Sequence, residues 1–214
     1  TFDFYRPPAA DLLYRLEHLP HGVFENPAIL HLCSNSLTDP EIADVTLAMA
    51  TMAKRAGCLI SVDANLRHNL WPGGEADASL VTQLLDGAEL LKLSQEELDY
   101  LRADHPAESW LSERLAAGVK VILITDGPNE VILKGVGVDQ RIAPPNVEAV
   151  DTTAGGDAFI GGLLAELSAH GINENWHNDS DFLHRAVDTA CRCGAHAVTR
   201  PGAYAALPTR ADID

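Results

Sequence analysis

Short apolar runs alternate along the chain with longer stretches in which apolar residues recur at helical spacing. The apolar runs predict buried strands over residues 28–33, 58–62, 89–93 and 119–125. The periodic stretches predict helices over about 39–56, 77–86, 94 onward, 110–117, 154–170 and 180–195. A strand that is regularly followed by a helix is typical of parallel βαβ units.

Helix ends are marked by local signals. Asp39 offers an N-cap that is followed by a proline at the first helical position. Ser94 and Glu97 have the spacing of a capping box, in which a hydroxyl and a carboxylate satisfy each other's backbone amides. Gly57 and Gly118 come where helices are expected to end. We therefore expect helices to begin at or just after Asp39 and Ser94 and to end just before Gly57 and Gly118.

Two strand-like segments, 130–134 and 138–143, lie on either side of a glycine-containing turn and predict a hairpin. The whole pattern predicts one α/β domain over residues 1–214: a three-layer αβα sandwich with a mainly parallel central sheet and late antiparallel strands at one edge. The alternation of Phe2 and Phe4 with polar neighbours predicts a strand entered midway, so we expect the numbering to start inside a larger protein.

Composition excludes several classes of function. The chain of 214 residues is 46% hydrophobic and 21% charged, which is ordinary for a globular protein. Its 15 basic and 31 acidic residues give a net charge of −16, which disfavours nucleic acids and anionic membranes as partners. No apolar run has the roughly 18 residues of a membrane span. Any phosphate that the protein binds must therefore be held locally, by backbone amides, helix ends or a metal.

The chain contains four cysteines, and Cys191 and Cys193 are separated by one residue. That spacing is too short for the usual zinc knuckle, and no second pair accompanies it. Buried free thiols are one interpretation, and a metal or redox site is the other. Free thiols indicate a reducing compartment, so we expect a cytoplasmic protein.

In an open α/β sheet, ligands bind beyond the carboxyl ends of the strands. Polar clusters follow four predicted strands, at 63–67, 94–97, 125–127 and 151–157. In the last cluster the small residues Ala154, Gly155 and Gly156 lead directly into a helix, where bare amides and the helix dipole favour an anion. Asp157 either complements that dipole or acts as a general base beside a phosphate.

Residues 150–164, VDTTAGGDAFIGGLL, closely resemble the carboxyl-terminal signature of ribokinase-like (PfkB) carbohydrate kinases, Asp-Thr-x-Gly-Ala-Gly-Asp. Ala154-Gly155 replaces Gly-Ala there, a swap of two small residues. The resemblance covers nearly the whole chain and is strongest to bacterial fructokinases. Compared with that family, the chain lacks the amino-terminal third, and residues 1–12 resemble the end of the lid and its return to the main domain.

Other segments carry the resemblance as well. Residues 62–71 are similar to the part of fructokinases and ketodeoxygluconokinases that faces the sugar. Residues 92–97 match an Asn-x-x-Glu element with serine in place of asparagine, and residues 125–127 match a nucleotide-side Thr-x-Gly turn. Glu130 stands where that turn has its second glycine, and residues 194–203 resemble the segment beside adenine and a monovalent cation.

The resemblance implies a role for each matching residue. Asp157 would be the catalytic base, and the amides of Ala154, Gly155 and Gly156 would hold the γ-phosphoryl group. Contacts to the sugar and the transferred group would come from Arg6, Asn65 and Arg67. Nucleotide contacts would come from Lys92, Ser94, Thr125, Gly127, Gly155 and Gly156. Glu97 would place Mg²⁺ through water, and a potassium-like ion would be held by Asp151, Thr153, Ala197 and Gly202.

The function implied is an ATP-dependent sugar kinase that uses Mg²⁺ and K⁺ and converts fructose to fructose 6-phosphate. Ketodeoxygluconate or a nucleoside is the alternative acceptor within the family. A truncated, non-catalytic nucleotide-binding protein is the alternative of another class. Expected partners are a sugar and ATP, with neither nucleic acid nor membrane. A homodimer is also expected, because members of the family often pair through their lids.

Overall fold

The computed structural model describes residues 9–26 and 28–213, which form an α/β fold with six strands among them. The chain divides into two compact units, residues 1–122 and 123–214, with strand β4 (Val121–Thr125) crossing the boundary. Each unit is described by itself. The predicted α/β class is confirmed, and the single domain over 1–214 stays a prediction.

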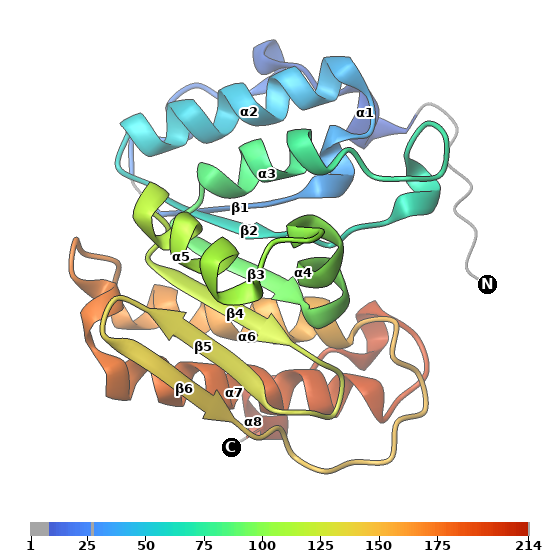
Figure 1. The fold of residues 1–214 in the computed structure, drawn as a ribbon, viewed down its shortest axis with the longest axis vertical. Coiled ribbons are helices and arrows are strands. Elements are labelled where there is room, and N and C mark those ends of the chain that lie inside the picture. The colour runs from blue at the N-terminus through green and yellow to red at the C-terminus, as the bar shows by residue number, and fades with distance from the viewer. Residues whose placement is uncertain (1–8, 27, 214) are drawn as a thin grey trace. The chain divides into compact units, whose positions relative to one another are not determined.

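The amino-terminal unit is built on three parallel strands, β1 (Ile29–Cys33), β2 (Leu59–Asp63) and β3 (Leu90–Ser94) (Figure 1). Every residue of β2 is buried, and so are the first four of β3. Strands buried on both faces have near-continuous apolar sequences, which is why the sequence pattern located them to within two residues. Polar side chains interrupt these runs at a few positions, and those positions matter for the site.

The helices of this unit are α1 (Ala10–Leu13), α2 (Pro40–Arg55), α3 (Ala78–Asp86), α4 (Gln95–Arg102) and α5 (Ala107–Ala117). The predicted cap at Asp39 is confirmed, because its carboxylate accepts a hydrogen bond from the Glu41 amide at 2.9 Å. Asp77, which was not predicted as a cap, caps α3 in the same way. Helix α5 begins at Ala107, three residues before the predicted start at Trp110. The prediction took the first large apolar residue as the start, whereas the helix begins directly after Pro106.

The carboxyl-terminal unit contains the predicted antiparallel hairpin, β5 (Val131–Gly135) and β6 (Val138–Ile142). Its helices are α6 (Gly155–His170), α7 (Ser180–Val198) and α8 (Arg210–Ile213). Helices α6 and α7 lie side by side behind the hairpin in Figure 1 and pack along their lengths. Helix α7 continues three residues beyond its predicted end.

Glycines bring α6 and α7 together. A Cβ atom at Gly155 would lie 2.8 Å from Cγ1 of Val198, and one at Gly194 would lie 3.1 Å from the Gly155 carbonyl oxygen. About two turns further along α6, a Cβ at Gly162 would lie 2.6 Å from Sγ of Cys193. Both ends of this contact therefore favour residues without side chains.

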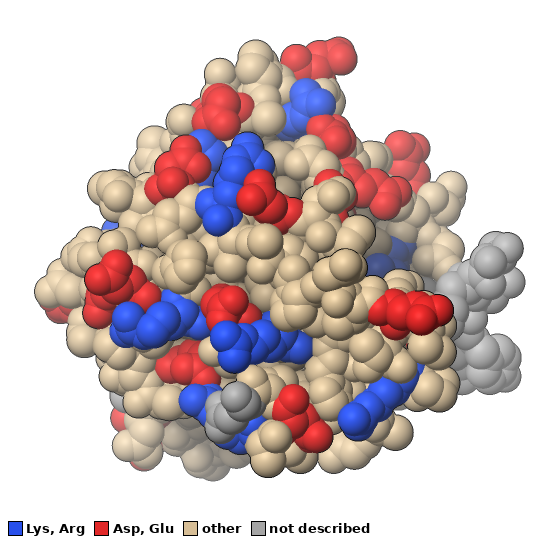
Figure 2. Space-filling view, turned by 90° about the horizontal axis from the view of Figure 1, so that it is seen from below, with Lys and Arg blue, Asp and Glu red and all other residues tan. Residues whose placement is uncertain are grey.

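Acidic and basic groups are intermixed over the surface shown in Figure 2, with uncharged atoms between them. Several of the charges are paired, for example Arg192 with Asp188 one helical turn away at 2.8 Å. In residues 9–26 and 28–213, no helix has the length and apolar character needed to cross a membrane.

The glycine contact between α6 and α7 predicts the effect of two neighbouring substitutions. Gly162→Ala should lower the free energy of unfolding by about 1–3 kcal/mol, because its methyl group meets Cys193 and Ala190 in a packed interface. Gly161→Ala is the matched control, because its methyl group enters open space, and we expect no loss or a gain of up to about 1 kcal/mol. Urea denaturation measures both, and equal effects would contradict the contact.

Candidate active site

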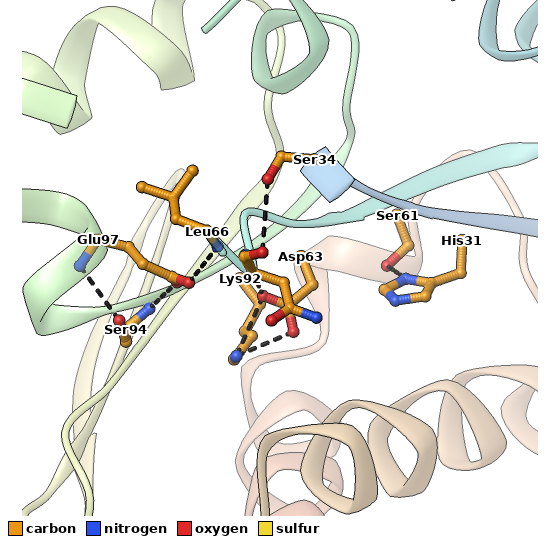
Figure 3. Close-up of polar contacts among 9 residues, drawn as sticks. His31, Ser34, Ser61, Asp63, Leu66, Lys92, Ser94 and Glu97 are labelled. Atoms are coloured by element: carbon orange, nitrogen blue, oxygen red, sulfur yellow. Dashed lines mark hydrogen bonds and ion pairs between the residues drawn. The ribbon is translucent and has the colours of Figure 1, made fainter. Parts of the chain in front are cut away.

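One face of the strands in the amino-terminal unit carries polar side chains (Figure 3). Asp63 ends β2 and is the register partner of Lys92 on β3, so the two side chains project to the same side. The Lys92 ammonium donates to both carboxylate oxygens of Asp63, at 2.9 and 3.1 Å. Lys92 is 6% exposed and Asp63 is 2% exposed, so this is a fully buried ion pair.

The environment of the pair perturbs Asp63. Burial raises the pKa of its carboxyl from 3.8 to about 6, the Lys92 charge opposes that rise, and the nearby Glu97 charge adds to it. Because ionisation is costly in the folded state, Asp63 stabilises the fold most below about pH 4 and loses that contribution as the pH rises through about 6. At neutral pH the rest of the fold must therefore offset the free-energy cost of keeping the buried Asp63 carboxylate ionised beside Lys92.

The segment after β2 is held in place by hydrogen bonds from its backbone amides. The Ala64 amide donates to the Lys92 carbonyl at 3.0 Å, and the Asn65 amide donates to Oδ1 of Asp63 at 3.2 Å. Asn65 has a φ of 38°, a left-handed conformation that asparagine adopts more readily than most residues. Asn65 and Arg67, both predicted to face the acceptor, are half-buried at this position.

Ser94 and Glu97 form the predicted capping box at the start of α4. The Glu97 amide donates to Oγ of Ser94 at 3.1 Å, and the Ser94 amide donates to Oε2 of Glu97 at 2.7 Å. The remaining oxygen, Oε1, accepts the Leu66 amide at 2.7 Å (Figure 3). Residues 63–67 and 92–97, both chosen from the sequence, are thus brought into one hydrogen-bonded cluster.

Glu97 was expected to place Mg²⁺, and its surroundings test that expectation. Each carboxylate oxygen accepts a backbone amide, and the side chain is 9% exposed. A direct metal bond would compete with these amides and would leave a buried N–H group without a partner. The donor set does not fit direct coordination of a metal, and no catalytic step is assigned to a divalent ion at Glu97. Placement of Mg²⁺ through water, which the resemblance implies, stays a prediction.

Sequence reasoning missed two features of this face. It did not pair Lys92 with Asp63, and it did not find the contact of His31 with Ser61, whose Nδ1 and Oγ atoms lie 3.0 Å apart (Figure 3). Each of these residues interrupts an otherwise apolar strand at an alternate position. Polar residues at alternate strand positions could have indicated these contacts, because side chains two residues apart on a strand face the same side. Register partners on neighbouring parallel strands also face the same side.

In the carboxyl-terminal unit, α6 begins without a side-chain cap from the described residues. Its N-cap is Ala154, and Gly155, Gly156 and Asp157 form the first turn. The first amides of a helix have no intrahelical acceptor, and together with the helix dipole they attract an anion. The structure therefore gives α6 the small-residue start that the sequence predicted, without a side-chain cap, although the Gly155 amide donates to the Thr152 carbonyl at 3.3 Å.

Asp157 is exposed at this helix start and lines a cavity of about 280 Å³ within the unit. The same cavity is lined by residues from α6, from α7 and from the carboxyl-terminal segment, among them Gly161, Ala165, Cys193, Pro208 and Arg210. Arg210 forms an ion pair with Glu166, which also lines the cavity. The side chain proposed as a base from the sequence is thus accessible to a ligand.

Asp151 organises the loop that precedes α6. Its Oδ1 accepts the amide and the hydroxyl of Thr153, at 3.0 and 2.5 Å, and its Oδ2 accepts the Gly202 amide at 3.0 Å. The Thr153 hydroxyl, followed by the two amides, lowers the pKa of Asp151 below its usual value. Three of the four residues predicted to hold a monovalent cation are therefore hydrogen-bonded to one another.

Ala197, the fourth predicted cation ligand, lies in the last turn of α7, where its carbonyl accepts the Arg200 amide at 3.3 Å. Thr125 ends β4, and Gly127 follows in a turn with a φ of 53°. Arg6 lies outside the described residues. All four cysteines are free, and no cluster of three or more metal-ligating side chains occurs in the part of the chain that the structure describes.

Comparisons with known proteins show the family of the chain. The model of the "pfkB family carbohydrate kinase" matches residues 1–210, so the chain belongs to that family. A fructokinase from Vibrio alginolyticus is 34% identical over 213 residues, which is 100% of this chain and 67% of that protein. The chain spans 64–67% of the first curated relatives it matches.

Solved structures show the same fold. Fructokinase from Xylella fastidiosa with bound ATP has a TM-score of 0.94 at 36% identity, and the match covers 100% of this chain and 68% of that one. A fructokinase double mutant from Vibrio cholerae in a fructose, ADP and potassium ion bound form has a TM-score of 0.86 at 31% identity, covering 96% and 64%. The predicted family and its fold are confirmed.

The buried ion pair predicts a pH-dependent loss of stability in Lys92→Met. Removing one partner of such a pair costs about 3–5 kcal/mol, because the other charge stays buried without compensation. The pKa of Asp63 should rise further without Lys92, so the loss should be greater at about pH 8 than at about pH 5.5, where Asp63 takes up a proton. Chemical denaturation at both pH values measures it.

The control for this experiment is Lys54→Met, since Lys54 is exposed and donates to the Gly87 carbonyl at 3.2 Å. We expect a change of no more than about 0.5 kcal/mol at either pH. An equal loss at both pH values in Lys92→Met would be incompatible with a role for Asp63 protonation.

Proposed function

We propose that this chain belongs to an ATP-dependent sugar kinase that transfers the γ-phosphoryl group of ATP to a primary hydroxyl of fructose, giving fructose 6-phosphate. The observation that carries the proposal is the small-residue start of α6 with the exposed Asp157, in a chain of the pfkB family. The relatives named fructokinase support the choice of sugar. Because the chain spans about two thirds of them, the activity is a proposal about the whole protein.

Asp157 is proposed as the general base. Its carboxylate accepts the proton of the sugar hydroxyl while the hydroxyl oxygen forms a bond to the γ-phosphorus of ATP. The bond between that phosphorus and the bridging oxygen of ADP breaks, and ADP leaves with the electron pair. Such a transfer needs mainly positioning and charge neutralisation, and a base within reach of the hydroxyl contributes about 10²–10⁴-fold.

The start of α6 is proposed to bind the transferred group. The amides of Ala154, Gly155 and Gly156 donate to phosphoryl oxygens, and the dipole of the helix favours the negative charge. Gly155 has a second role, because any side chain there would collide with Val198 and displace the helix start. This explains in steric terms why glycine suits position 155.

The remaining residues are proposed to bind the two substrates. Arg6, Asn65 and Arg67 contact the sugar and the transferred group, and Arg67 suits phosphate because a guanidinium donates two parallel hydrogen bonds. Lys92, Ser94, Thr125 and Gly127 belong to the nucleotide side. Lys92 acts there through Asp63, since its ammonium is already bound by that carboxylate.

A monovalent cation is proposed at Asp151, Thr153, Ala197 and Gly202. The hydrogen-bonded loop supplies a carboxylate, a hydroxyl and carbonyl groups, and oxygen ligands of this kind suit hard cations. The relative crystallised with fructose, ADP and a potassium ion supports the assignment. Bound there, the cation would supply positive charge near the start of α6. A homodimer and a cytoplasmic location stay predictions.

The proposal is tested by sugar-dependent release of ADP in the presence of Mg²⁺, with and without K⁺. Fructose, glucose, ribose, ketodeoxygluconate and a nucleoside are compared, after the intact mass of the sample has been measured. We expect turnover with fructose above the rate without sugar. A chain of 23.0 kDa that binds ATP and turns over no acceptor would instead support the non-catalytic alternative.

The role of Asp157 predicts that Asp157→Asn leaves ATP affinity nearly unchanged and lowers kcat by about 10²–10⁴-fold. Asp181→Asn is the control, because Asp181 is also an exposed carboxylate in the first turn of a helix, α7. We expect its kcat to stay within about twofold of the unaltered chain. Equal activity of Asp157→Asn and the parent chain would refute the assignment.

A further inference from the structure

Glu97 does more than an ordinary capping-box glutamate. A capping box needs one carboxylate acceptor for the N-cap amide, and Oε2 of Glu97 provides it for Ser94 at 2.7 Å. The second oxygen, Oε1, accepts the amide of Leu66, also at 2.7 Å (Figure 3). Ser94 lies at the start of α4, whereas Leu66 lies in the segment after β2. One buried carboxylate therefore joins two segments that are distant in sequence.

The segment that Glu97 holds is the one that carries two proposed substrate contacts. Its three successive amides are each bound by a different acceptor: Ala64 by the Lys92 carbonyl, Asn65 by Asp63 and Leu66 by Glu97. The last bond is the one nearest Arg67. It is also the only one of the three that ties the segment to a helix.

The bonded segment includes an uncommon backbone conformation. Asn65 has a φ of 38°, a left-handed conformation that is uncommon outside glycine but that asparagine adopts more readily than most residues. The Asn65 carbonyl is further held by Oγ of Ser34 at 3.5 Å. Arg67 directly follows Leu66, so the bond from the Leu66 amide to Glu97 holds the backbone from which the half-buried Arg67 side chain extends.

We infer that Glu97 is a positioning residue, which fixes residues 64–67 against the start of α4 and so holds Asn65 and Arg67 in place for the acceptor and the transferred phosphoryl group. The clamp itself is a property of the amino-terminal unit, and its catalytic consequence rests on the proposed function. Its chemistry differs from that of a metal ligand, since both carboxylate oxygens bind backbone amides.

The clamp is tested first by hydrogen exchange of the Leu66 amide, measured by NMR on the ¹⁵N-labelled chain. In the unaltered chain this amide should be protected, and in Glu97→Gln it should exchange at least about tenfold faster, because the side-chain amide cannot accept from both N–H groups. Glu96→Gln is the matched control, since Glu96 is its exposed neighbour in the same helical turn, and it should leave the exchange unchanged.

A second variant separates the clamp from helix capping. Ser94→Ala removes the hydroxyl that accepts the Glu97 amide and leaves both oxygens of Glu97 in place. We expect the Glu97 amide to exchange faster in this variant while the Leu66 amide stays protected. If Glu97→Gln does not fold, exchange of the Leu66 amide in the unaltered chain and in Ser94→Ala still tests the clamp. A Leu66 amide that exchanges in either protein as fast as one in an unstructured peptide would overturn it.

The catalytic consequence is tested by the kinetics of ADP release. Glu97→Gln should raise the KM for the sugar by about tenfold or more, with the Mg²⁺ concentration for half-maximal rate changed by less than about twofold. A large rise in the Mg²⁺ requirement with a protected Leu66 amide and an unchanged sugar KM would overturn the inference in favour of a metal ligand. Without any kinase activity, the proposed function fails, and the exchange data still decide the clamp.

Discussion

Three ionisable side chains are buried next to one another in the amino-terminal unit, and their charges do not cancel. Lys92 supplies one positive charge, and Asp63 and Glu97 supply two negative ones. A buried charge without partners costs several kcal/mol, so the excess must be offset locally. Backbone amides of Ser94, Asn65 and Leu66 do this by donating to the two carboxylates. The conformation of the loop after β2 is therefore a consequence of charge burial.

Local signals made much of the fold predictable from the sequence. Asp39, Asp77 and Ser94 cap their helices through amides two or three residues away, so the sequence alone contains both partners. The contacts of Lys92 with Asp63 and of Glu97 with Leu66 join residues 29 and 31 positions apart. These depend on strand register and on how a loop returns to a helix, which no short motif encodes.

The candidate site was likewise predictable from the sequence only in part. The small residues before Asp157 identify a helix start that suits an anion, and the structure has such a start. The cavity beside Asp157 was not foreseen, because residues 207–210 and Ile213 line it only once the end of the chain has folded back against α6 and α7. A motif thus located the helix start, whereas the space beside it depends on tertiary packing.

The burial of the thiols has a practical consequence for spectroscopy. Burial raises the pKa of Cys191 to about 12 and raises that of Cys193 as well, so both sulfurs stay protonated and slow to alkylate near neutral pH. Cys58 is buried too, which leaves the half-buried Cys33 as the most accessible sulfur. Cys33 is the register partner of Asp63. A maleimide dye or spin label attached there would report on the neighbourhood of the buried charges.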